Sequence, residues 1–330
     1  MAAAMLTAQS GFSTNRAAAD AMLQQGKAAA AIPFLERARA ADPAHYATGW
    51  DLALAYRQTR RWNEARQLLQ RLIGLGDRGE LRNLLAEVEE AAGNTAAAAR
   101  EYQEAAHLEP TEKNIADWAN HLMKYRAYDS ALKVYASGAT MHPRSVALRI
   151  GLGTAHYSNG NYDDAAREFC AAADVDPADL RPVEFLGKAI GIAPAWSGSV
   201  SERLAGYAAR FPHQPLARLY YGLSLDQPDQ APRQERELRA ALALDGRLAE
   251  AHLQLGILAD QQGRAAEAIA SLGKAVKLNP GLGAAHFRLS RLYRKQGDTV
   301  RAARHLAEYQ RLRASRSGQA ASEVKGLRVE

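Results

Sequence analysis

The sequence predicts an all-α protein in which short antiparallel helix pairs stack along the chain as a solenoid. Apolar residues recur three, four and seven positions apart, which is the spacing of an amphipathic helix. A small residue recurs about every 34 residues along nearly all of the 330-residue chain. Hydrophobic residues make up 47% of the chain and aromatic residues only 7%, because alanine, the best helix former, supplies much of the apolar share.

The clearest helix pair lies between residues 146 and 177. A first helix is predicted before the turn at Asn159-Gly160-Asn161 and a second before Pro177, because glycine and proline interrupt helices. The apolar stripes of the two helices consist of Leu152, Gly153 and His156, and then of Tyr162, Ala165, Phe169 and Ala172. A pair this short cannot bury its own apolar face, so it needs neighbouring pairs.

Three series of markers place such neighbours along the chain. The small residues of the predicted first helices, at steps of 33 to 35 residues, are Ala19, Ala53, Ala86, Ala119, Gly153, Gly187, Gly222, Gly256 and Ser290. The small residues of the predicted second helices are Ala31, Ala65, Ala98, Ala131, Ala165, Ala268 and Ala302. The units close at Pro43, Asp77, Pro110, Pro143, Pro177, Pro212, Gly246 and Pro280. Because the three series keep one phase, we expect about nine repeats over residues 12–313.

This pattern resembles the tetratricopeptide repeat, a 34-residue helix–turn–helix unit. The first-helix positions of that family fall on Leu52, Ala53 and Tyr56, on Leu255 and Gly256, and on Leu289 and Tyr293. Its second-helix positions fall on Ala98, Tyr102 and Ala105, on Ala131 and Tyr135, and on Ala268, Leu272 and Ala275. The resemblance implies a right-handed superhelical solenoid. HEAT and armadillo repeats are longer, and the base-reading code of pentatricopeptide RNA-binding repeats has no evident counterpart here.

The first five predicted repeats follow the pattern with small departures. Repeat one turns at Gly26 and ends at Pro43, after a flexible segment over residues 1–11. Repeat two ends in a loose loop over residues 74–79, and the first helix of repeat three is acidic. Repeats four and five are regular.

Repeats six and seven depart from the pattern. A capping box at Ser199 and Glu202 predicts that the second helix of repeat six restarts there and ends before Pro212. The first helix of repeat seven should finish at Leu225, and Gln234 in place of a small residue predicts a distorted turn. Residues 180–214 are therefore a candidate bend between lobes 12–179 and 215–313. The alternative is a degenerate unit inside one continuous array.

The ends of the chain and its single cysteine have simple interpretations. Residues 314–330 are polar and mixed in charge, so we expect them to be disordered. The start resembles the tail of a secretory signal but lacks its positive residues, so we expect a cytoplasmic protein. The alternative is an exported or periplasmic protein whose true N-terminus is longer. No run of about 20 apolar residues predicts a membrane span. Cys170 has no disulfide partner and is expected to be a buried small hydrophobe.

No catalytic, cofactor or metal motif accompanies the repeats, so we expect a protein that is not an enzyme. The nine histidines form no His-Glu-x-x-His motif, and His252 and His286 occupy one repeat position, which predicts packing roles. Gly151-Leu152-Gly153 lies inside a helix and does not follow a strand, so it is not a phosphate loop. We expect no cofactor and no metal.

The first helices of a stacked array line a concave surface, and we expect a protein or peptide partner there. In repeats seven to nine, an apolar strip that ends in arginines is predicted on this surface. It consists of the residues three before and one after each marker, with one residue a turn later and one at the rim. The predicted partner-binding residues are Leu216, Leu219, Leu223, Leu253, Ile257, Phe287, Arg291 and Arg294. Such a strip suits a helix or extended peptide with apolar anchors and an acidic end. The alternative is that these leucines only pack between helices.

The lysine and asparagine clamp by which some members of the family hold the terminal carboxylate of chaperone clients is absent. Residues such as Trp50, Leu54, Ala116, Ile150 and Thr154 occupy its positions. The resemblance therefore does not extend to chaperone docking.

The positive charge of the chain is concentrated in the last repeat. The formal charge is +6, and the segment from Gly283 to Arg316 has nine basic and two acidic residues, so the rest of the chain is nearly neutral. The simplest interpretation is a charged outer face that keeps a terminal repeat soluble. An acidic protein partner comes next. Nucleic acid comes third, because the few interleaved aromatic residues, Phe287, Tyr293 and Tyr309, are mostly core positions of the repeat.

Overall fold

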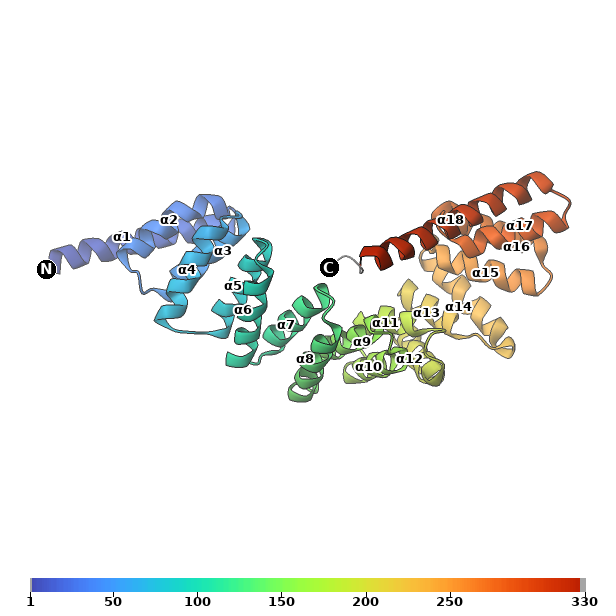
Figure 1. Cartoon of the computed structure of the whole chain (residues 1–330), viewed down its shortest axis with the longest axis horizontal. Helices are drawn as coiled ribbons and strands as arrows, with labels where there is room; N and C mark the ends of the chain where they lie inside the picture. Colours follow the sequence, from blue (N-terminus) through green and yellow to red (C-terminus); the bar gives the residue numbers. More distant parts are fainter. Residues whose placement is uncertain (1, 327–330) are drawn as a thin grey trace. The chain divides into compact units, whose positions relative to one another are not determined.

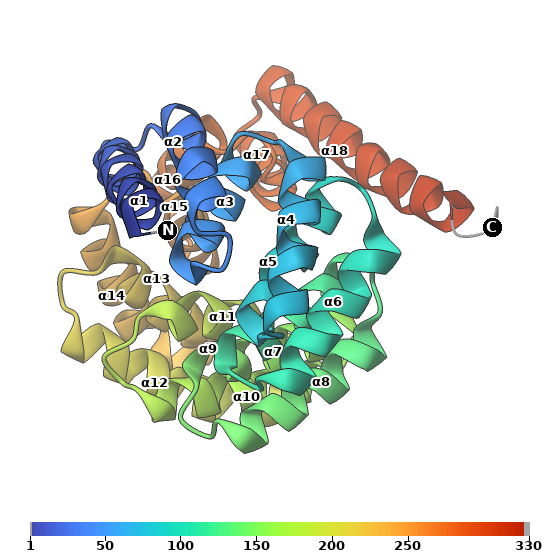
Figure 2. The same ribbon diagram turned by 90° about the vertical axis from the view of Figure 1, so that its left-hand side faces the viewer.

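The computed structural model describes residues 2–326, with side chains described for residues 9–315, and it forms two compact units, 1–160 and 161–330. In each unit consecutive helices pack side by side as hairpins (Figures 1 and 2). The predicted all-α fold of stacked helix pairs is therefore confirmed. None of the helices in the described part of the chain combines the length and the apolar character that crossing a membrane requires.

The helices of the first unit alternate between first and second helices of the predicted repeats. They are α1 (Ala2–Gln24), α2 (Ala28–Ala41), α3 (Tyr46–Gln58), α4 (Trp62–Leu75), α5 (Gly79–Ala91), α6 (Thr95–Leu108), α7 (Glu112–Lys124), α8 (Tyr128–Met141) and α9 (Val146–Ser158). Several of their starts are set by local capping. The side chains of His45, Thr111 and Ser145 accept hydrogen bonds from backbone N–H groups at the starts of α3, α7 and α9.

The second unit continues the alternation with two short 3₁₀ helices. Its elements are α10 (Tyr162–Val175), α11 (Arg181–Ala189), η1 (Pro194–Trp196), α12 (Ser197–Arg210), α13 (Pro215–Ser224), η2 (Pro228–Gln230), α14 (Ala231–Leu244), α15 (Ala249–Gln261), α16 (Ala265–Leu278), α17 (Gly283–Lys295) and α18 (Thr299–Gly326). The described helices thus make up nine pairs.

The small marker residues lie where pairs of helices approach most closely. Ala31, Ala65, Ala98, Ala131 and Ala268 have no exposed surface. A Cβ atom added to Gly256 would lie 2.6 Å from Leu272 Cγ, so only glycine fits between α15 and α16 in this arrangement. Gly151 serves the same purpose, because a Cβ there would meet the Tyr135 ring. Gly151 of the Gly-x-Gly motif therefore serves helix packing.

Repeat six is irregular, as predicted, but its second helix begins elsewhere. The helix α12 starts at Ser197, directly after the 3₁₀ turn η1, and no side chain caps it. The predicted capping box at Ser199 and Glu202 is wrong, because the 3₁₀ turn begun by Pro194 leads straight into the helix. The predicted end before Pro212 is confirmed, since α12 stops at Arg210.

Other expectations about segments have mixed outcomes. The first helix of repeat seven stops at Ser224 with Leu225 as its cap, as predicted, and η2 fills the distorted turn. Helices α1 and α18 enter the segments 1–11 and 314–330, of which Met1 and residues 327–330 lie outside the described residues. The flexibility of these segments and a bend at residues 180–214 stay predictions. The boundary between the two compact units follows Gly160 in the sequence.

Candidate partner-binding face

The predicted partner-binding strip lies on the first helices α13, α15 and α17 of the second unit, and we call this surface the first-helix face. Two of its predicted members lie in the core. Leu219 and Leu253 are each 5% exposed. Leu219 packs in one cluster with Leu238, and Leu253 in another with Leu272. Their burial agrees with the alternative interpretation, that these leucines pack between helices.

The remaining predicted residues reach the surface to different extents. Leu216, Leu223 and Ile257 are partly buried and pack against the same core clusters. Phe287 is 40% exposed, and both Arg291 and Arg294 are exposed. The accessible part of the strip is thus concentrated on α17.

An aromatic pair and unpaired arginines make up this accessible part. The rings of Phe287 and Tyr309 lie 5.1 Å apart, so the last helix α18 supplies half of the aromatic surface. The Arg291 guanidinium lies 6.0 Å from the centre of the Phe287 ring. Neither Arg291 nor Arg294 forms an ion pair with any described residue. The sequence did not predict that Tyr309 lies beside Phe287, because this contact arises from the packing of α18 against α17.

The first helices of the first unit carry charges that are already paired. Arg57 pairs with Glu87, and Lys113 lies 2.6 Å from Asp117. Glu90 accepts a hydrogen bond from Lys124 at 3.1 Å. Burial raises the pKa of Glu90, but hydrogen bonding outweighs burial and the pKa is lowered. A charged partner would have to displace these contacts. A charged partner that binds the unpaired arginines of α17 would not have to displace existing ion pairs.

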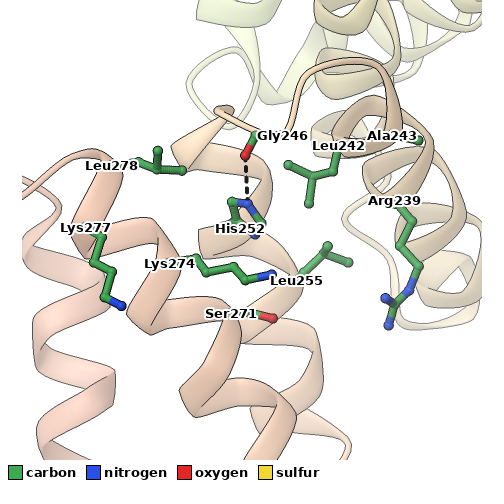
Figure 3. A pocket seen from close by; sticks show the side chains of 10 residues that line it. All are labelled: Arg239, Leu242, Ala243, Gly246, His252, Leu255, Ser271, Lys274, Lys277 and Leu278. Carbon is green, nitrogen blue, oxygen red and sulfur yellow. Dashed lines mark hydrogen bonds between the residues drawn. The ribbon is translucent and has the colours of Figure 1, made fainter.

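The opposite sides of the repeats hold pockets between consecutive second helices. Pockets of about 470, 390 and 590 Å³ lie between α2 and α4, between α10 and α12, and between α14 and α16. Figure 3 shows the last of these, where Lys274 of α16 points toward Leu255 while Lys277 points away. His252 donates from Nε2 to the Gly246 carbonyl at 3.1 Å and is 8% exposed, so its predicted packing role is confirmed.

Two sequence features with possible chemistry, metal-ligating side chains and the single cysteine, can be checked in the described residues. No three His, Cys, Asp or Glu side chains of the described residues are placed to hold a metal ion. Cys170 is 1% exposed, and burial raises its pKa to about 11, which disfavours the reactive thiolate. The predicted buried role of Cys170 is confirmed.

Comparison with known families places the chain. One tetratricopeptide-repeat model matches residues 22–88 and 261–322, and a second tetratricopeptide-repeat model matches residues 116–180 and 235–283. Together these segments cover more than half of the chain. The chain belongs to the tetratricopeptide-repeat (TPR) family. Members of this family generally mediate interactions between proteins.

Solved structures share the TPR fold at low sequence identity. The C-terminal part of a TPR repeat-containing protein from Cytophaga hutchinsonii is 14% identical with a TM-score of 0.55, over 79% of this chain and 94% of that one. A chain of the APC/C hetero-tetramer Cut9–Hcn1 is 16% identical with a TM-score of 0.50, over 87% of this chain and 60% of that one. Identities this low show the fold alone. A comparison with curated proteins finds no match.

Proposed function

We propose that this TPR protein is a non-catalytic interaction module or assembly scaffold, and that its first-helix face binds a peptide or helix of another protein. The observation that carries the proposal is the exposed Phe287, which packs on the half-buried Tyr309, together with the unpaired and exposed Arg291 and Arg294 of the same helix. Aromatic and arginine side chains dominate the energetics of protein interfaces. The expected partner segment has an apolar or aromatic anchor next to acidic residues, because opposite charges across an interface select and orient the partner.

Nucleic acid is the second candidate, and the ion pairs of the last repeat speak against it. Arg288, Arg301 and Arg311 are paired with Asp260, Asp298 and Glu308. The Arg301 guanidinium and the His305 ring both lie against Tyr293, which is therefore not free to stack on a base. An acidic peptide needs only the two free arginines and the aromatic pair.

Peptide-array binding followed by fluorescence anisotropy tests the proposal. Peptides with one aromatic anchor and two or three acidic residues should bind the intact chain, with affinity falling as salt rises. The variant Arg291→Glu/Arg294→Glu should lose at least about tenfold in affinity, since each charge reversal turns attraction into repulsion. Phe287→Ala should lose a similar amount by removing the anchor contact.

The matched control is Lys274→Glu/Lys277→Glu, which reverses two charges of the same unit on the second-helix side. It should bind as the wild type does. Equal weakening in both double variants would mean that net charge alone attracts the peptides, and the proposed face would be wrong. A gel shift with arbitrary single-stranded nucleic acid that weakens steeply between low and high salt would favour the second candidate, because phosphate contacts are lost as salt rises.

A further inference from the structure

One position of the repeat carries a basic side chain in several units, four residues before the first-helix marker. At this position Arg218, His252 and His286 donate to the carbonyl groups of Pro212, Gly246 and Pro280, at 2.9, 3.1 and 3.2 Å. The side chain thus satisfies a carbonyl of the loop that joins two repeats. In repeat two the same position is Gly49, inside α3.

The side chain of Arg39, from α2, occupies the space that Gly49 leaves. A Cβ atom at residue 49 would lie 2.7 Å from Leu72 Cδ2 and 2.9 Å from Arg39 Nη1, so the glycine leaves room for both Leu72 and the guanidinium. Arg218, His252 and His286 each have a carbonyl acceptor. Arg39 Nη1 is buried and has no hydrogen-bond acceptor among the described residues. A buried donor without a partner is costly, so this arrangement needs an explanation.

Arg39 and a second arginine face one pocket with no carboxylate free to pair with them. Arg71 lines the same pocket of about 470 Å³ and is exposed, with no ion pair among the described residues. Burial lowers the pKa of Arg39, and the positive charge of Arg71 lowers it further. An anion between the two guanidinium groups would oppose both effects, because a nearby negative charge favours the charged form of arginine.

Two carboxylates, Glu36 and Glu64, also line the pocket, and both are engaged by other side chains. Glu36 accepts from the Tyr56 hydroxyl at 2.7 Å and lies 3.7 Å from Arg61. Glu64 accepts from Arg61 at 2.8 Å. Because these two negative charges belong to the lining of the pocket, it suits an anion with one charge better than a doubly charged phosphate.

The rest of the pocket is apolar. Its lining includes Ala40, Pro43, Leu52 and Leu68, with Gln67 as the one uncharged amide side chain. We propose that this pocket between α2 and α4 binds a carboxylate carried on a small apolar or aromatic body, held by the guanidinium groups of Arg39 and Arg71. Guanidinium groups match the planar carboxylate by paired hydrogen bonds.

The equivalent pocket of Figure 3 provides the contrast. Its free cations, Lys274 and Lys277, are exposed and stay hydrated, and Arg239 pairs with Glu235 and Glu267. No buried donor there lacks an acceptor. That pocket is thus a matched control, with cations and apolar walls but without the unsatisfied guanidinium.

Calorimetry and thermal unfolding with sodium benzoate test the proposal, with benzamide as the uncharged isostere and ionic strength held constant. Benzoate should bind the wild type with one site and raise its unfolding temperature in a concentration-dependent way, and benzamide should not. Arg39→Met should weaken benzoate binding by at least about tenfold, because it removes the charge-assisted hydrogen bonds. The same variant should unfold at an equal or higher temperature without ligand, because an uncompensated buried charge is gone.

The outcomes separate the proposal from a structural role of Arg39. Lys274→Met should bind benzoate as the wild type does. Absence of a benzoate effect, or an equal effect on Arg39→Met, would overturn the proposal. A second arm compares a short peptide ending in phenylalanine with a free terminal carboxylate and the same peptide amidated. Displacement of benzoate by the free acid alone would identify a protein terminus as a source of the carboxylate, and displacement by neither would identify small free carboxylates.

Discussion

At the scale of single residues, spacing along a helix predicted which side chains share a face but not which of them stay exposed. Leu219, Leu253 and Phe287 occupy the same repeat position, three residues before the marker. The two leucines are 5% exposed and the phenylalanine 40%. Leu219 and Leu253 belong to repeats with a further pair beyond them, whereas Phe287 belongs to the last pair. The same repeat position is thus buried in α13 and α15 and exposed in α17.

The first prediction separates these two roles. Leu253→Ala should lower the free energy of unfolding by about 2–5 kcal/mol, the usual cost of a cavity at a buried leucine. Phe287→Ala should cost less than about 1 kcal/mol, because its ring is partly solvated. Urea denaturation of both variants checks this. Equal losses would show that Phe287 is a core residue and that the partner-binding face is misplaced.

At the scale of elements, the sequence predicted the helix pairs well because packing repeats with the same period as the markers. The start of α12 was missed because the 3₁₀ turn at Pro194–Trp196 competes with a side-chain cap that looks adequate locally. The Arg39 site could not be predicted either. Its cause is the space left by Gly49 on the neighbouring helix, and spacing within one helix does not reveal such a contact.

The last two helices meet at a histidine pair. The Nδ1 atoms of His286 and His305 lie 3.0 Å apart, and His286 Nε2 donates to the Pro280 carbonyl. With its Nε2 hydrogen directed at the Pro280 carbonyl, His286 accepts from His305 at Nδ1. Burial lowers the pKa of His305, and the charges of His286 and Arg304 lower it further. Tyr293 covers the His305 ring.

The second prediction follows from the sign of this shift. The pKa of His305 in the folded chain lies below the value of about 6.5 expected for unfolded chains, so acidification protonates the unfolded state first. The stabilisation is complete above about pH 6.5 and is lost as the pH falls through the folded pKa. Urea denaturation at pH 7.5 and pH 5 should show a smaller loss for His305→Phe, which keeps the ring, than for the wild type. Parallel losses would show that other groups control the acid response.

At the scale of the whole molecule, stability should be distributed along the array. Each repeat contacts mainly its neighbours, so a local defect should weaken nearby pairs first. The two compact units, residues 1–160 and 161–330, have separate core clusters. A destabilised repeat in one unit should therefore leave much of the other protected.

The third prediction tests this with Gly256→Ala. The added Cβ would lie 2.6 Å from Leu272 Cγ and 3.1 Å from its backbone nitrogen, so α15 and α16 must separate, at a cost of about 1–3 kcal/mol. Hydrogen exchange followed by mass spectrometry should show faster exchange in α15 and α16, and little change in α3 to α6. Gly273→Ala is the control, because its Cβ meets no atom within 4 Å and alanine favours the helix by about 0.5–1 kcal/mol. If Gly256→Ala accelerated exchange equally in α3 to α6, the chain would unfold as one cooperative body. The interfaces between adjacent repeats would then be strong enough to carry the defect along the whole array.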